Sequence, residues 1–171
     1  MTVNSEKIMK LTDFKVIESL MRTIASMEFH SRPGPGSHSG WAGRGQGKVD
    51  VESTQTPSGE IILRFHEQGR FTADETAGRA IPFNNVYRWT FLEDRLSLHH
   101  ERRGIEEAVW LFDLIHDEHS SGLISAHPHP CGKDSYHACL KHDEYGLEME
   151  WTIIGPVKNE HLHYRYYTHR N

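Results

Sequence analysis

A short alternating stretch in the last third of the chain decides the class of fold. Apolar and polar side chains alternate along it without a break, in the order Leu147-Glu148-Met149-Glu150-Trp151-Thr152-Ile153. This alternation is typical of a β-strand with one buried and one solvated face, because successive side chains point to opposite sides of a sheet. Similar short runs, separated by turn residues, continue from Phe29 to the end of the chain. The pattern predicts an antiparallel, mainly β domain and argues against alternating strands and helices.

The alternating runs are numerous enough to form a closed barrel. About nine strands are expected, over residues 41–54, 60–71, 82–92, 95–102, 107–116, 121–127, 134–142, 146–155 and 160–169. Residues 31–38 are rich in Pro, Gly and Ser and are predicted to form a loop. Closing the sheet would remove the exposed edges that an open sheet must protect. We therefore predict a single antiparallel β-barrel of about eight to ten strands over residues 29–171.

One helical pattern precedes the predicted barrel, over residues 11–28. Its apolar side chains recur at steps of three and four and are Leu11, Phe14, Ile17, Leu20 or Met21, Ile24 and Met27. Thr12 or Asp13 is available as an N-cap. We expect a single amphipathic α-helix whose apolar face packs on an end or side of the barrel, preceded by a flexible N-terminus at residues 1–10.

The composition predicts one cytoplasmic domain that binds neither nucleic acid nor a membrane. The 171 residues include 19 Lys and Arg against 24 Asp and Glu, a formal charge of -5, whereas an anionic partner demands a basic face. No apolar run near the N-terminus resembles a signal peptide, and no stretch is long enough to cross a bilayer. A chain of this length buries a core without needing disulfides or a structural metal. The sequence leaves a homodimer open.

The cysteines and a glycine repeat have simple structural interpretations. Cys131 and Cys139 have a spacing that matches no common zinc or haem motif, and we interpret them as reduced thiols. Gly43, Gly45 and Gly47 share one face of a predicted strand, but no helix follows them, as a phosphate-binding loop would require. We expect these glycines to let the strand bend or to let other parts of the chain approach closely.

The register of the predicted strands brings polar side chains toward the interior, where they could line a pocket. The candidate ligand-binding residues are Glu67, Arg88, His100, Arg102, Asp134, Tyr136, Trp151 and Tyr166. For Arg88 the register is ambiguous, because the aromatic residues beside it occupy the inner face. A charge on an inner face must be paired or hydrated, since an isolated buried ion is very costly. Together these residues favour a partly wet cavity that binds a small molecule, with an internal salt-bridge network as the alternative.

The same pocket would also suit an enzyme, for instance an isomerase, cyclase or hydrolase. Asp134 or His129 would act as general acid or base, and Tyr136 or Arg102 would stabilise developing negative charge. Cys131 near His129 offers a nucleophile and a base, although a free cysteine is more often a small buried apolar residue. The sequence leaves the binding protein and the enzyme both open.

A metal or haem protein is the third alternative, because the chain contains 14 histidines. His127, His129 and Cys131 are close in sequence and carry good zinc or copper ligands, but no third ligand has a predictable position. His161 and His163 lie on the last predicted strand, and a histidine that pointed inward there would suit a haem iron. The sequence requires no metal or cofactor.

Four motifs occur in an order that resembles a bacterial family of unknown function. They are Leu63-x-Phe65-x-Glu67-x-Gly69, Tyr87-x-Trp89, His129-x-Cys131-x-x-Asp134-x-Tyr136 and Trp151-x-x-x-Gly155-Pro156-x-Lys158. The resemblance covers most of residues 41–169 and implies a lipocalin-like, calycin-type antiparallel barrel whose ligand and reaction are not established. This chain departs from the family in carrying Val109-Trp110 where relatives have a Phe-His pair, and in its N-terminal helix.

Overall fold

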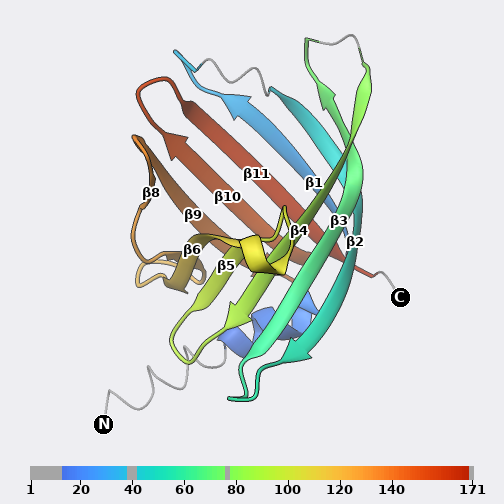
Figure 1. Ribbon diagram of the computed structural model, residues 1–171, viewed down its shortest axis with the longest axis vertical. Helices are drawn as coiled ribbons and strands as arrows, with labels where there is room; N and C mark the ends of the chain where they lie inside the picture. Colours follow the sequence, from blue (N-terminus) through green and yellow to red (C-terminus); the bar gives the residue numbers. More distant parts are fainter. Residues whose placement is uncertain (1–12, 38–41, 76–77, 170–171) are drawn as a thin grey trace.

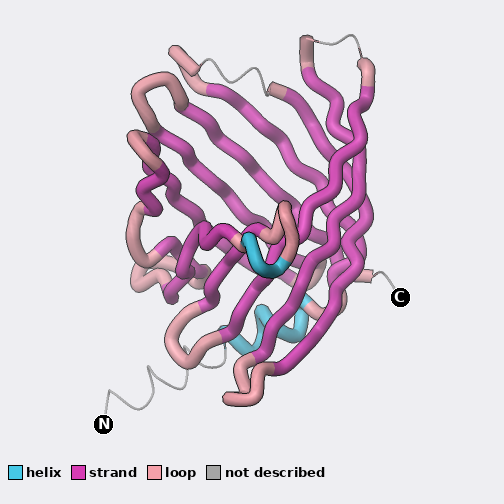
Figure 2. The backbone as a smooth tube through the Cα atoms, in the orientation of Figure 1, coloured by secondary structure: helices cyan, strands magenta, loops and turns pink. Residues whose placement is uncertain are grey.

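The computed structural model describes residues 13–37, 42–75 and 78–169. Within these ranges the chain forms a short helix, a 3-10 helix and a set of antiparallel strands (Figure 1, Figure 2). The strands are β1 (Ile24–Pro33), β2 (Gly43–Gln55), β3 (Ile61–Ala73), β4 (Ala80–Phe91), β5 (Leu96–His100), β6 (Val109–His116), β7 (Leu123–Ser125), β8 (His129–Cys131), β9 (Asp134–Asp143), β10 (Gly146–Ile154) and β11 (Asn159–Thr168). The 3-10 helix, η1 (Ile105–Glu107), lies between β5 and β6.

Ten of the strands close into an antiparallel barrel. Neighbouring strands pair in the order β10-β11-β1-β2-β3-β4-β5-β6-β7-β9, and β9 pairs back with β10. β8 pairs only with β9 and takes no part in the closure. The predicted antiparallel barrel with one N-terminal helix is therefore confirmed. Among the described residues, no helix is long and apolar enough to span a membrane.

The helix is shorter than the sequence pattern predicts. It spans residues 13–21, and the chain then turns into β1 at Ile24, so the predicted helix over 11–28 is wrong at its C-terminal end. A bulge between Ile24 and Ser26 shifts the register of β1 against β11, and as a result Ile24 and Met27 are both buried in a strand. The three-residue spacing of Ile24 and Met27 therefore resembles that of one face of a helix. The barrel thus starts before residue 29.

The predicted loop over 31–38 is wrong at its start, because Ser31–Pro33 form the end of β1. The last residue of that loop, and residues 1–12 with the predicted flexible N-terminus at 1–10, lie outside the described residues.

The helix closes one end of the barrel (Figure 1). Aliphatic side chains fill the interior next to it. Phe14, Ile17 and Met21 of the helix belong to the same buried cluster as the inward residues of the strands. Fully buried leucines complete this region, namely Leu63, Leu96, Leu98, Leu114, Leu123, Leu140 and Leu147. Burying one such side chain stabilises a fold by about 1.5–3 kcal/mol. We call this end of the barrel the packed half.

Aromatic rings wall the other end of the barrel, which we call the cavity half. A Cβ atom at Gly45 of β2 would overlap the ring of Phe29 on β1, and one at Gly43 would overlap Phe71 on β3. Both rings therefore lie against the backbone of β2, where only a residue without a side chain leaves room. The prediction that other parts of the chain approach closely at these glycines is therefore confirmed for Gly43 and Gly45.

Candidate functional site

A cavity of about 660 Å³ occupies the cavity half of the barrel. Its lining combines aromatic, aliphatic and polar side chains, namely Phe29, Ser31, Phe71, Ile81, Pro82, Phe83, Asn84, Asn85, Tyr87, His100, Arg102, Glu160, Leu162 and Tyr164. These residues come mainly from β4, β11 and β1. The volume is in the range of small-molecule pockets, which is about 300–1,000 Å³.

Stacked aromatic rings form one wall of this cavity. The ring of Phe29 stacks on Phe71 with centroids 5.7 Å apart and on Tyr164 with centroids 5.1 Å apart. Phe83 meets Phe29 edge-on at 5.5 Å. Such contacts hold the rings in fixed positions and give the cavity an apolar wall.

Buried polar atoms without partners lie along the same cavity. Ser31 is 3% exposed, and neither its Oγ nor Nε2 of His100 has a hydrogen-bond partner among the described residues. Trp151 packs inside the barrel at 5.6 Å from Tyr164, ring centroid to centroid, and its Nε1 is equally unpartnered. Leaving such a group unpaired costs about 1–3 kcal/mol, so a bound molecule that satisfied it would gain affinity.

Glu67 of β3 is a buried carboxyl near the centre of the barrel, 1% exposed. The Tyr166 hydroxyl donates to its Oε1 at 2.7 Å, and Nδ2 of Asn85 donates to its Oε2 at 3.3 Å. Burial raises the pKa of Glu67 to about 7, and the two hydrogen bonds only partly oppose that rise. The carboxyl is therefore about half protonated near neutral pH. Asn85 connects it to the cavity, which Asn85 lines.

His100 stands at the edge of the cavity and stacks on Tyr87, with ring centroids 4.8 Å apart. Burial lowers the pKa of His100, and the positive charge of Arg102 lowers it further. The imidazole is therefore neutral near pH 7, and its unpartnered Nε2 is free to donate or to accept, depending on the tautomer. Arg102 also lines the cavity, but its side chain is exposed to solvent.

Glu160 is a second buried carboxyl of the cavity wall, at 8% exposure. It opens β11, pairs with Pro33 of β1 and shares the inner face with Leu162 and Tyr164. Within the described part of the chain no lysine, arginine or histidine forms an ion pair with it. The cation that its charge influences is Lys158, whose pKa is raised mainly by Asp134 and further by Glu160, but the Lys158 ammonium forms its ion pair with Asp134.

Asp134 and Tyr136, two residues of the sequence-predicted pocket, lie on β9 outside the cavity lining. Oδ2 of Asp134 pairs with Nζ of Lys158 at 2.7 Å, and this contact is the main reason why the pKa of Lys158 is raised. A Cβ atom at Gly155 would overlap Asp134. The Asp and Gly-Pro-x-Lys motifs therefore meet and tie β9 to the turn between β10 and β11. Tyr136 packs half-buried against the core.

Arg88 also lies outside the cavity lining. Its side chain lies on the outer face of β4, where its Nη1 pairs with Oε1 of Glu101 at 3.0 Å. Nε of Arg64 pairs with the other oxygen of the same carboxylate at 3.1 Å. Glu101 is 5% exposed, so this group of three charges is largely sheltered from water. A carboxylate distant in sequence thus holds Arg88 outside the cavity, and its ligand-binding role stays a prediction.

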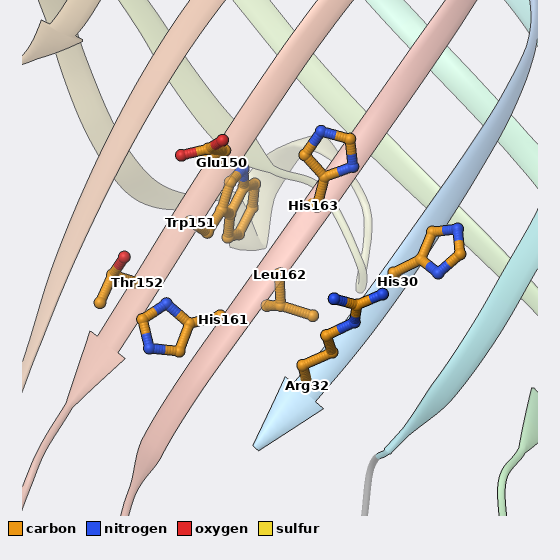
Figure 3. A pocket seen from close by; sticks show the side chains of 8 residues that line it. All are labelled: His30, Arg32, Glu150, Trp151, Thr152, His161, Leu162 and His163. Atoms are coloured by element: carbon orange, nitrogen blue, oxygen red, sulfur yellow. The ribbon is translucent and has the colours of Figure 1, made fainter. Parts of the chain in front are cut away.

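The histidines of the last strand point outward. His161 and His163 border a groove of about 430 Å³ on the outer surface of β1, β10 and β11 (Figure 3). The groove is lined by His30, Arg32, Glu150, Trp151, Thr152, His161, Leu162 and His163. Neither histidine therefore reaches the interior as a haem ligand would. His127 is exposed, and the side chains of His129 and Cys131 lie outside the described part of the structure.

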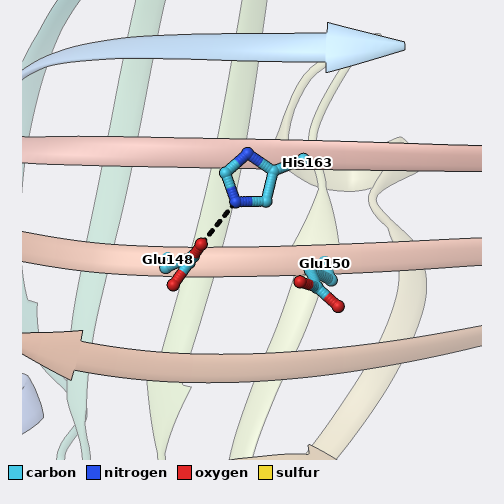
Figure 4. A group of neighbouring side chains, drawn as sticks. All are labelled: Glu148, Glu150 and His163. Atoms are coloured by element: carbon cyan, nitrogen blue, oxygen red, sulfur yellow. Dashed lines mark hydrogen bonds and ion pairs between the residues drawn. The ribbon is translucent and has the colours of Figure 1, made fainter. Parts of the chain in front are cut away.

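One cluster on this outer surface has the composition of a metal site. Ligand atoms of Glu148, Glu150 and His163 all lie within 4.8 Å of one another (Figure 4). Nε2 of His163 and Oε1 of Glu148 form a hydrogen bond of 2.6 Å, so two of the three groups already satisfy each other. These are the described side chains that could hold a divalent cation, and they lie apart from the cavity.

Sequence reasoning located part of this site and missed the rest. Glu67, His100, Trp151 and Tyr166 lie inside the barrel, and Arg102 lies at the edge of the cavity, as their register predicts. The cavity residues Ser31 and Glu160 were missed. The sequence did contain a signal for Glu160. This residue lies two positions before Leu162 and four before Tyr164, so strand alternation places all three side chains on the same inner face.

Comparison with known proteins identifies a family but no activity. A model of a family of unknown function, DUF6314, matches residues 19–168, from the helix to the end of β11. No curated protein and no solved structure shows significant similarity to the chain. The matched segment contains all of the barrel strands, and the chain therefore belongs to the DUF6314 family of unknown function.

Proposed function

We propose that the protein is a cytoplasmic, lipocalin-like barrel that binds a small molecule in its cavity half. The observation that carries this proposal is the cavity of about 660 Å³, into which the buried and unpartnered polar atoms of Ser31 and His100 open. A barrel whose interior served stability alone would fill this space with side chains, as the packed half does. Aromatic walls would bind the apolar body of a ligand, and the few polar groups would orient it.

A neutral apolar dye tests this proposal directly. N-phenyl-1-naphthylamine fluoresces strongly when it leaves water, and we expect its emission to rise on titration with the protein. Leu162→Trp places a large side chain in the cavity and should abolish the rise. His161→Trp is the matched control, since His161 is the preceding residue and faces outward. Dye binding that survives Leu162→Trp in a variant with wild-type circular dichroism would overturn the proposal.

An enzyme on the same pocket is the second candidate, and the pKa of Glu67 near 7 is the observation that favours it. A general acid or base works best when its pKa is close to the working pH. Asn85 would have to move for Glu67 to reach a molecule in the cavity, because it donates to the Glu67 carboxyl. Asp134 and His129 stay predictions for this role.

Native mass spectrometry of freshly purified protein separates these two candidates. A ligand that co-purifies is released, identified and incubated again with wild-type protein and with Glu67→Gln. Conversion of the ligand by the wild type and not by Glu67→Gln supports the enzyme. Recovery of the unchanged ligand from both proteins supports the binding protein.

A further inference from the structure

The cavity has one corner where polar groups are concentrated, at the pairing of β1 with β11. Ser31 pairs with Leu162 and Pro33 pairs with Glu160, so Ser31 and Glu160 are diagonal neighbours on the inner face. Both side chains line the cavity, at 3% and 8% exposure. The Ser31 hydroxyl is unpartnered, and the Glu160 carboxylate makes no ion pair with a described residue. The corner therefore offers two hydrogen-bond acceptors.

The charges around the cavity favour a positively charged ligand over a negatively charged one. Glu160 is buried, and Lys158, the cation that its charge influences, is held in an ion pair by Asp134 outside the cavity. A buried carboxylate without a direct ion pair gains from an opposite charge placed beside it. Arg102 is the one cation in the cavity lining, and it is exposed, so water already solvates it. His100, the remaining basic group of the lining, has a lowered pKa through burial and is neutral. An anionic ligand would find one hydrated charge and would face a buried carboxylate.

Aromatic rings next to this corner would hold the apolar body of a cationic ligand. Phe29 precedes Ser31 by two residues on the same face of β1, and Tyr164 lies on β11 beyond Leu162. Their rings stack with centroids 5.1 Å apart. Because these rings are packed on one another, they offer the apolar body of a ligand a fixed surface next to the carboxylate.

From these features we infer that the ligand is an organic ammonium, a primary or secondary amine on an apolar or aromatic body. The ammonium group donates to the Glu160 carboxylate and the Ser31 hydroxyl, and the apolar body lies against Phe29 and Tyr164. This inference rests on the proposed binding function and specifies the ligand class of the same cavity. It requires no covalent step.

Three probes that share one apolar body and differ in the charge of the end group test the ligand class. They are 4-phenylbutylamine, which is cationic near neutral pH, the neutral 4-phenyl-1-butanol and the anionic 4-phenylbutyrate. Binding is measured by displacement of N-phenyl-1-naphthylamine and by calorimetry. We expect the amine to bind at least about tenfold more tightly than the alcohol, and the carboxylate to bind most weakly.

Matched variants assign that preference to the proposed contact. Glu160→Gln keeps the shape and removes the charge, and we expect it to reduce the preference for amine over alcohol to about twofold or less. Glu148→Gln on the outer surface is the control and should leave the preference unchanged. A preference that persists in Glu160→Gln would overturn the assignment.

The outcomes for the wild-type protein separate this inference from the proposed function. Equal affinity for amine and alcohol, tighter binding of the carboxylate, or dye binding without binding of any probe would each overturn the ammonium ligand and leave the binding function in place. Failure of the dye and of all three probes would count against both.

Discussion

The packed half and the cavity half of the barrel are built from the same strands but are filled by different side chains. Leu63 and Phe71 both point inward from β3, yet Leu63 is fully buried beside other leucines and Phe71 lines the cavity. On β11, Tyr166 donates to a buried carboxyl near the centre, whereas Glu160 at the start of the strand has no ion-pair partner among the described residues. A single strand thus serves the hydrophobic core at one end and the cavity at the other.

This division predicts that stability and binding respond to different positions. In the packed half the leucines fill the space, which favours the folded state. Trp89, which pairs with Leu63 and Leu98, leaves its Nε1 unpartnered there, but packed side chains surround it and leave no room for a ligand. In the cavity half the unpaired polar atoms of Ser31 and His100 border an open space that a ligand could fill. The two halves should therefore differ when equivalent side chains are removed.

The largest contrast is expected for one leucine from each half. Leu96 of β5 is fully buried, and Leu96→Ala should lower the free energy of unfolding by about 2–5 kcal/mol through lost contacts and a new void. Leu162 already borders the cavity, and Leu162→Ala should cost about 1 kcal/mol or less because fewer contacts are lost. Urea denaturation of the two variants measures the difference. Equal losses would show that the cavity half is packed as tightly as the other.

Glu67, near the border between the halves, gives the next largest effect, as a dependence of stability on pH. Its pKa is about 7 in the folded protein against an ordinary value of 4.5, so the folded state holds the proton more tightly. The resulting stabilisation is fully present below about 4.5 and is lost as the pH rises to about 7. The difference between these values, about 2.5, corresponds to about 3 kcal/mol, because one pKa unit is worth about 1.4 kcal/mol.

Glu67→Gln tests this sign and size, because an amide does not titrate in this range. Between pH 4.5 and 7.5 the wild-type protein should lose up to about 3 kcal/mol more of its unfolding free energy than the variant does. Subtracting the two urea-denaturation curves removes contributions from other groups, including His100, whose lowered pKa acts in the opposite direction. Identical pH profiles would mean that the carboxyl is solvated and that the border between the halves is wet.

Much of this arrangement could be predicted from the sequence because a strand shows its two faces by alternation. Alternation along residues 147–153 gave the correct register of β10, and the same parity placed Glu67 and Tyr166 inside the barrel. These predictions need only local information. They extend to any strand without an irregularity.

The errors arise where a long-range or irregular feature decides the outcome. The bulge between Ile24 and Ser26 hid β1 and, with it, the cavity residue Ser31, which fell in a predicted loop. Glu101 holds Arg88 on the outer face of the barrel, and no local sequence pattern predicts this ion pair. The division into two halves depends on which side chains contact one another across the barrel. These contacts join residues far apart in sequence, so local patterns do not predict them.

The smallest expected effect is the change in unfolding free energy when either of two buried serines is replaced by alanine. It tests whether the cavity half is less stable than it could be because it binds a ligand. Ser31 is unpartnered, so Ser31→Ala should raise the free energy of unfolding, by about 1 kcal/mol, since a buried hydroxyl without a partner is removed. Ser97, buried at 6% exposure, donates its hydroxyl to Asp113, and Ser97→Ala should lower the same free energy by a similar amount. Thermal and urea denaturation of both variants give the two signs. If both substitutions lower the free energy of unfolding, water satisfies the Ser31 hydroxyl in the empty cavity. If Ser31→Ala raises it and Ser97→Ala lowers it, Ser31 is a position where the unliganded protein loses stability that a bound ligand would restore.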